Sequence, residues 1–117
     1  MYQFSILLFA LAAVAGLIMA VMHFKKVSPP RPVLAVLHGI FAASGLVVLL
    51  LAVMKAGMQG TPAIALGLLV VAALGGFALL SSHLRGRALP SGLVVGHALL
   101  AVAGFLTLVA AEYVLMT

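Results

Sequence analysis

The sequence predicts an all-α integral membrane protein, an up-down bundle of four transmembrane helices built from a duplicated helical hairpin. Two observations carry this prediction. First, 67% of the 117 residues are hydrophobic and only 6% are charged, whereas about 25% of the residues of a soluble domain are charged. Second, long apolar runs follow one another without the alternation of barrel strands, and short polar or basic segments separate them.

An internal repeat includes all four histidines of the chain. In each copy a His precedes a short basic segment with proline, and a second His follows, with a Gly seven residues beyond it. The offset between copies is 60 residues from His23 to His83 and 59 residues from His38 to His97. A repeat at a fixed period defines the structural unit of a fold. The two predicted repeat units are residues 1–59 and 60–117.

Four helices are expected within a single transmembrane domain that covers the whole chain. They are, in chain order, about residues 2–24, 32–54, 62–82 and 91–115. Each is long enough to cross about 30 Å of hydrocarbon at about 1.5 Å per residue. Pro32 opens the second helix, where a missing N–H costs little, and Ser91 is a candidate N-cap of the fourth. The first run lacks a preceding basic region and is too long for a signal peptide, so we interpret it as a retained helix.

The basic residues predict the orientation. Five of the six Lys and Arg residues lie in the first and third loops; they are Lys25, Lys26, Arg31, Arg85 and Arg87. Lys55, in the second loop, is the sixth. Because basic loops stay in the cytoplasm, we expect a multi-pass protein of a bacterial-type inner (plasma) membrane with both termini outside. We therefore attribute the net charge of +5 to basic residues that set the membrane topology and contact lipid headgroups, and nucleic acid is not an expected partner.

Small residues accompany the histidines on the predicted inner faces. Spacings of three, four and seven place His38, Ala42 and Gly45 on one stripe. His97, Ala101 and Gly104 form the matching stripe of the fourth helix. Small residues in lipid mark a close approach of helices, so the histidines are expected to point into the bundle. The glycines either serve close packing alone, the commoner role of any one Gly, or leave room for a flat cofactor, which the repeated spacing favours.

His38 and His97 are the candidate ligands of such a cofactor. Each lies about seven residues, or about 10 Å, into its helix, and a polar group at that depth indicates a functional site. The axes of diagonal helices in a bundle are roughly 13 Å apart, which is too far for two imidazoles to share one small ion but suits a haem iron between them. The residues expected to flank the porphyrin are Ala42, Ala101, Gly45 and Gly104.

Paired His on transmembrane helices, with small residues one or two turns away, resembles the pattern of membrane b-type cytochromes. The resemblance covers the four helices and implies haem b, held by His38 and His97 as axial ligands. It also implies single-electron transfer to or from a quinol or a partner redox protein, as an electron-transfer or quinone-linked oxidoreductase component. No helix here carries two widely spaced His, as in the usual two-haem arrangement, so two haems stacked across the membrane are not expected.

His23 and His83 lie at the predicted cytoplasmic ends of the first and third helices. Three roles are open for them. They cap the last carbonyls of these helices, contact haem propionates together with Lys25, Arg85 or Arg87, or ligate a second site. Capping or propionate contact is favoured over ligation.

Two other function classes also agree with the sequence. One is a non-catalytic accessory subunit of a larger membrane complex, or a homodimer, with the histidines as hydrogen-bonding groups between helices. The other is a metal-ion binding or transport module that uses the four His as one cluster. Cysteine is absent, which excludes disulfides and thiolate metal sites, and the chain has no phosphate-binding loop or Ser-His-Asp set.

Overall fold

The computed structural model describes residues 2–26 and 33–115. The described residues form four α-helices and a short π-helical segment, without strands: α1 (Gln3–Phe24), α2 (Val33–Lys55), α3 (Gly60–Leu84), α4 (Ser91–Ala110) and η1 (Ala111–Leu115). The expected all-helical class and its four helices are therefore confirmed.

The helix bounds lie close to the predicted ones, and the differences have local causes. α3 begins two residues before Pro62, because proline needs no hydrogen-bond partner for its nitrogen in a first helical turn. The prediction of Ser91 as an N-cap is wrong. Pro90 occupies the cap position in an extended conformation, so Ser91 is the first helical residue and its side chain makes no cap hydrogen bond. The predicted helix start at Pro32 and the basic residue Arg31 lie outside the described residues.

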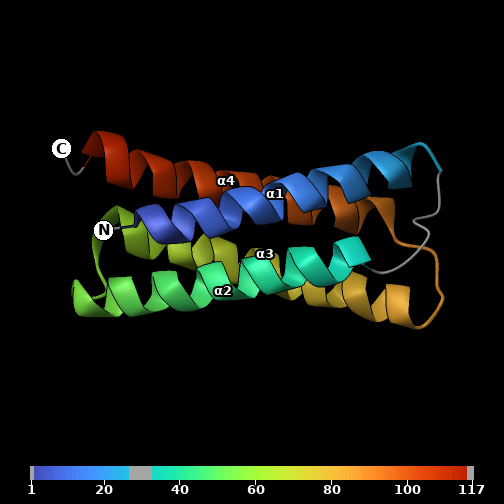
Figure 1. Cartoon of the computed structure of the whole chain (residues 1–117), viewed down its shortest axis with the longest axis horizontal. Coiled ribbons are helices and arrows are strands. Elements are labelled where there is room, and N and C mark those ends of the chain that lie inside the picture. The colour runs from blue at the N-terminus through green and yellow to red at the C-terminus, as the bar shows by residue number, and fades with distance from the viewer. Residues whose placement is uncertain (1, 27–32, 116–117) are drawn as a thin grey trace.

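The helices run side by side, alternately up and down, in a bundle of 43 × 21 × 20 Å (Figure 1). α1 packs mainly against α2, and α3 mainly against α4, which gives two hairpins. The hairpins meet less extensively, through α2 with α3 and α1 with α4, so α2 and α4 are diagonal.

The two ends of the bundle differ in charge. The start of α1, the end of η1 and the α2–α3 loop lie at one end, which we call the terminal end (Figure 1). The end of α1, the start of α2 and the α3–α4 loop lie at the opposite end. We call this the basic end, because it carries exposed Lys25, Lys26, Arg85 and Arg87.

The outside of the bundle is apolar. All four helices are long and apolar enough to cross a membrane. Large hydrophobic side chains such as Leu17, Leu51 and Leu99 are more than 60% exposed, which is not typical of a soluble monomer when many such residues are contiguous. These features suggest a multi-pass membrane protein.

The buried core lies in the terminal half of the bundle. Leu49 of α2 and Leu108 of α4, at equivalent positions of the repeat, are both 0% exposed. They belong to a cluster with residues from all four helices, namely Tyr2, Phe9, Val53, Ala65, Leu66 and Leu69. The hairpins are thus packed together in this half, whereas the basic half contains a partly open cavity.

Candidate functional site

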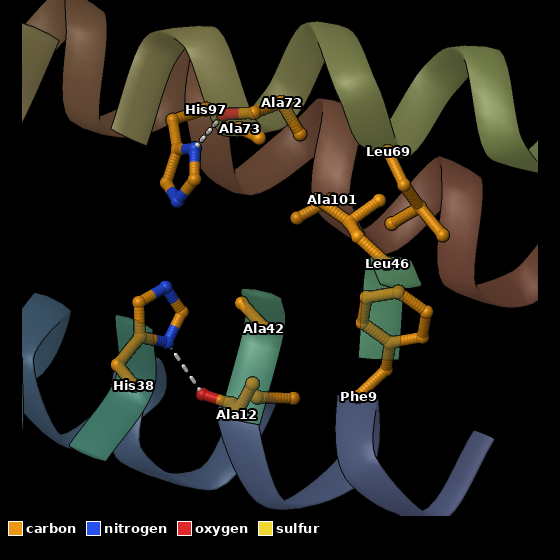
Figure 2. Close-up of a pocket in the computed structure, with 11 residues that line it drawn as sticks. Phe9, Ala12, His38, Ala42, Leu46, Leu69, Ala72, Ala73, His97 and Ala101 are labelled. Atoms are coloured by element: carbon orange, nitrogen blue, oxygen red, sulfur yellow. Dashed lines mark hydrogen bonds between the residues drawn. The ribbon is translucent and has the colours of Figure 1, made fainter. Parts of the chain in front are cut away.

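His38 of α2 and His97 of α4 face each other across the interior of the bundle (Figure 2). Their ring centroids are 6.0 Å apart, and the ring planes are nearly perpendicular, at 80°. Both side chains are half-buried. The structure therefore brings together, from diagonal helices, the two residues that the sequence singled out as ligands.

A backbone carbonyl on the neighbouring helix fixes each imidazole. His38 Nδ1 lies 2.7 Å from the carbonyl oxygen of Ala12 in α1, and His97 Nδ1 lies 2.6 Å from that of Ala72 in α3 (Figure 2). Because a carbonyl oxygen can only accept, Nδ1 must donate its proton in both bonds. In the neutral rings, Nε2 then carries a lone pair, which is the tautomer found in metal-binding histidines. The figure shows both Nε2 atoms directed into the space between the rings.

Two glycines make room for these rings. A Cβ atom on Gly16 would lie 3.0 Å from Cε1 of His38, and one on Gly76 would lie 3.1 Å from Cε1 of His97. Any larger residue would push the imidazole away, because real Cβ atoms rarely approach so closely. The sequence showed the regular spacing of Gly and His along the chain, but it did not show this contact between helices.

Gly45 and Gly104, which were expected to flank a porphyrin, lie deeper and contact core side chains. A Cβ atom on Gly45 would be 3.0 Å from the ring of Phe9, and one on Gly104 would be 2.7 Å from Cγ of Leu69. Both glycines are buried. Their contacts are those of close helix packing, the simpler of the two roles that the sequence left open.

A small apolar cavity of about 80 Å³ adjoins the imidazoles on the core side. Ala42 and Ala101 line it beside the histidines. Phe9, Leu46 and Leu69 bound it toward the core (Figure 2). The two alanines therefore lie where the sequence placed them, next to the interior histidines.

A larger cavity of about 750 Å³ extends between the hairpins from the imidazoles toward the basic end. Its volume is typical of sites for organic ligands, which are about 300–1,000 Å³. Gly16 and Gly76 line its inner part, and His23 and His83 line it near the ends of α1 and α3. The histidines of both pairs thus border one continuous space.

The basic residues differ in their relation to this cavity. Lys26 lines it, although the sequence pointed to this residue only as one of the basic residues that predict the orientation. Lys25, Arg85 and Arg87 are exposed at the same end of the bundle but do not line the cavity. Lys26, two residues after the last residue of α1, has a positive φ of 56°, the left-handed conformation in which many helices terminate.

His23 also links the two hairpins. Its Nε2 lies 3.1 Å from the hydroxyl oxygen of Ser91, the first residue of α4. The hydroxyl of Ser91 thus bonds a side chain of the other hairpin and not its own helix terminus. The Nε2 atom of His23 therefore bonds this hydroxyl and does not cap a carbonyl at the end of α1.

The described residues include all four histidines, and among them no three His, Asp or Glu side chains converge in a way that could hold a metal ion. The histidines form an interior pair and two residues nearer the basic end. This arrangement offers two ligands across a gap, which suits a cofactor that supplies the remaining ligands of its own metal.

The sequence reasoning missed the carbonyls of Ala12 and Ala72. A backbone acceptor leaves no mark of its own in a sequence. The available signal was Gly16 and Gly76, four residues after each carbonyl on the same helix face.

No protein-family model, curated protein or solved structure gives a significant match to this chain.

Proposed function

We propose that the chain is a small membrane cytochrome of the b type, which holds one haem between His38 and His97 and transfers single electrons. The observation that supports it most is the facing pair of imidazoles, 6.0 Å apart between centroids. With about 2 Å from metal to nitrogen and about 1.1 Å from nitrogen to ring centre, two axial imidazoles have centroids about 6 Å apart. The carbonyls that accept from Nδ1 leave the required Nε2 atoms free to ligate.

The space around the pair fits a flat tetrapyrrole. The small cavity extends from the imidazoles toward the core, and the large one extends toward the basic end. The inner walls are apolar and suit the porphyrin, whereas His23, His83 and Lys26 near the basic end suit the propionates. Haem supplies reversible one-electron chemistry, and the protein tunes its potential through the axial ligands, burial and nearby positive charge.

His38 and His97 would together hold the iron of a bound haem, and a haem held by two histidines would supply one-electron transfer. The proposed activity is therefore electron transfer. The electron partner is a quinol in the bilayer or a redox protein, and the chain acts alone, as a homodimer or within a larger membrane complex.

The membrane placement is part of the same proposal. The four apolar helices span a bacterial-type inner membrane, with the basic end in the cytoplasm and both termini outside. We take the two hairpins as copies of one duplicated unit, and the recurrence of the His–carbonyl and His–Gly contacts in both supports this. The haem would then lie nearer the cytoplasmic face.

The test is the visible spectrum of the purified protein. The wild type is expected to show a Soret band and, after reduction, sharp α and β bands, with one haem per chain. His38→Ala and His97→Ala should each remove or severely reduce the bound haem. The matched variants His23→Ala and His83→Ala, from the same repeat, should retain it, with a shifted potential at most.

A colourless, folded preparation from haem-sufficient cells would contradict the proposal, as would full haem content in both the His38 and the His97 variant. Metal analysis of a colourless sample would then distinguish a metal-binding module from an accessory subunit without cofactor.

A further inference from the structure

The walls around the interior histidines repeat almost residue for residue. Four pairs of equivalent positions around the small cavity are identical, namely Ala12 and Ala72, Ala13 and Ala73, His38 and His97, and Ala42 and Ala101. Phe9 and Leu69 both line the cavity at equivalent positions but are different residues. Leu46 also lines it, whereas its equivalent, Phe105, is a different residue and does not. Phe9 and Leu69 are both 6% exposed, and each packs over the equivalent glycine of its hairpin, Gly45 or Gly104. On the core side of the site, the two hairpins therefore have equivalent backbone positions but carry different side chains.

Haem b has an approximate symmetry of its own. A rotation of 180° about the in-plane axis that passes through the iron and between the propionates leaves the propionates in place. The same rotation exchanges methyl and vinyl groups on the two halves of the ring. If two equivalent histidines hold the iron and the propionates point to the basic end, this axis coincides with the axis that relates the two hairpins. Identical hairpins would therefore bind both orientations equally, and only residues that differ between them can select one.

We propose that Phe9 and Leu69 select one of the two orientations of the bound haem. This inference rests on the proposed function and deepens it. A phenyl ring and an isobutyl group differ in shape, and in a closely packed interior such a difference discriminates between a methyl and a vinyl group placed against it. Other unequal pairs line the wider cavity, namely Leu17 and Phe77, Met19 and Leu79, Ala20 and Leu80, Ala35 and Val94, Gly39 and Ala98, and Ala43 and Val102. Of these, Leu17, Phe77 and Leu80 are more than 40% exposed and constrain a ligand less than the buried Phe9 and Leu69.

Proton NMR of the oxidised protein in detergent micelles tests the proposal. Each orientation of a low-spin haem gives its own set of shifted methyl signals. The wild type should show one dominant set, with a population ratio above about fivefold. Phe9→Leu removes the difference between Phe9 and Leu69 and should lower the ratio toward one. The double exchange of Phe9→Leu with Leu69→Phe should shift the populations further, toward the other set.

A matched exchange serves as the control. Ile6 and Leu66 occupy equivalent positions three residues before Phe9 and Leu69, and they pack in the core without lining the cavity. Exchanging them, as Ile6→Leu with Leu66→Ile, should leave the wild-type ratio unchanged. An iron porphyrin whose substituents are symmetric about the propionate axis should give a single set in every variant.

Equal populations in the wild type would overturn the proposal, as would an unchanged population ratio in the double exchange with full haem content. If the double exchange does not fold, Leu69→Phe alone decides, because it also removes the difference between Phe9 and Leu69 and should lower the ratio. A wild type that binds no haem contradicts the proposed function itself, so the haem content of each sample separates the two failures.

Discussion

The interior histidines owe their positions to residues without chemistry of their own. Ala12 contributes only a carbonyl, and Gly16 contributes only the absence of a side chain, yet together they set the tautomer and the place of the His38 ring. Ala72 and Gly76 do the same for His97. The geometry of the proposed ligands therefore depends on close packing of helices within each hairpin.

Gly16→Ala is expected to weaken haem binding roughly 10- to 100-fold, the usual cost of disturbing a group that orients a metal ligand. The added Cβ would lie 3.0 Å from His38 Cε1, so the ring must move or lose its bond to the carbonyl. Titration of the haem-free protein with haemin measures the effect. Gly67→Ala is the control, because nothing lies within 4 Å of its Cβ position. Equal affinities of the two variants would contradict the role assigned to Gly16.

At this scale the sequence predicted which residues lie together but not always what each one touches. The depth and stripe of His38 and His97 correctly placed them in the interior, because a polar side chain deep in an apolar helix avoids lipid. The neighbours of Gly45 could not be predicted. A stripe defines a helix face, whereas the contact with Phe9 depends on how two helices are rotated and shifted against each other.

At the scale of the elements, the sequence predicted the helices because apolar runs and polar or proline-containing segments alternate clearly along the chain. The end of α4 was less predictable. Its last residues, Ala111–Leu115, form a π-helical turn that contains Glu112, and hydropathy does not distinguish this turn from an α-helix. The exact start of α4 was also less predictable, because either Pro90 or Ser91 could take the cap position, and the structure has Pro90 there.

The core cluster in the terminal half is expected to hold the hairpins together. Leu108→Ala should lower the free energy of unfolding by about 2–5 kcal/mol, because Leu108 is fully buried and its removal leaves a cavity. Leu106→Ala, on the same helix but 59% exposed, should have little effect. Unfolding in a denaturing detergent, followed by circular dichroism, compares the two. Similar losses for both would indicate that the hairpins are not joined through this core.

The whole molecule has a packed terminal half and a hollow basic half. The first contains Leu49 and Leu108, and the second contains the cavity between the hairpins. The sequence predicted the charge difference between the two ends, but it could not predict this division. The number of large side chains that meet at a given depth along the bundle axis depends on how all four helices are positioned against one another.

The orientation in the membrane can be tested with single cysteines, because the chain has none of its own. Gln59→Cys, in the α2–α3 loop, should react with a membrane-impermeant maleimide in intact cells. Ala88→Cys, in the basic α3–α4 loop, should react only after the cells are permeabilised. Both positions are exposed, so the difference reports the side of the membrane. A reporter fused after Thr117, outside the described residues, should be active as a periplasmic fusion; the opposite pattern would reverse the orientation.

The position of the cavity has a consequence for energy conversion. A haem held between His38 and His97 would lie toward one face of the bilayer, and the packed core around Leu49 and Leu108 would insulate it from the other face. An electron that arrives and departs at the basic end would cross little of the membrane potential, which is worth about 2.3 kcal/mol per charge per 100 mV. Such a protein would relay electrons without charging or discharging the membrane, and its turnover would be insensitive to the applied voltage.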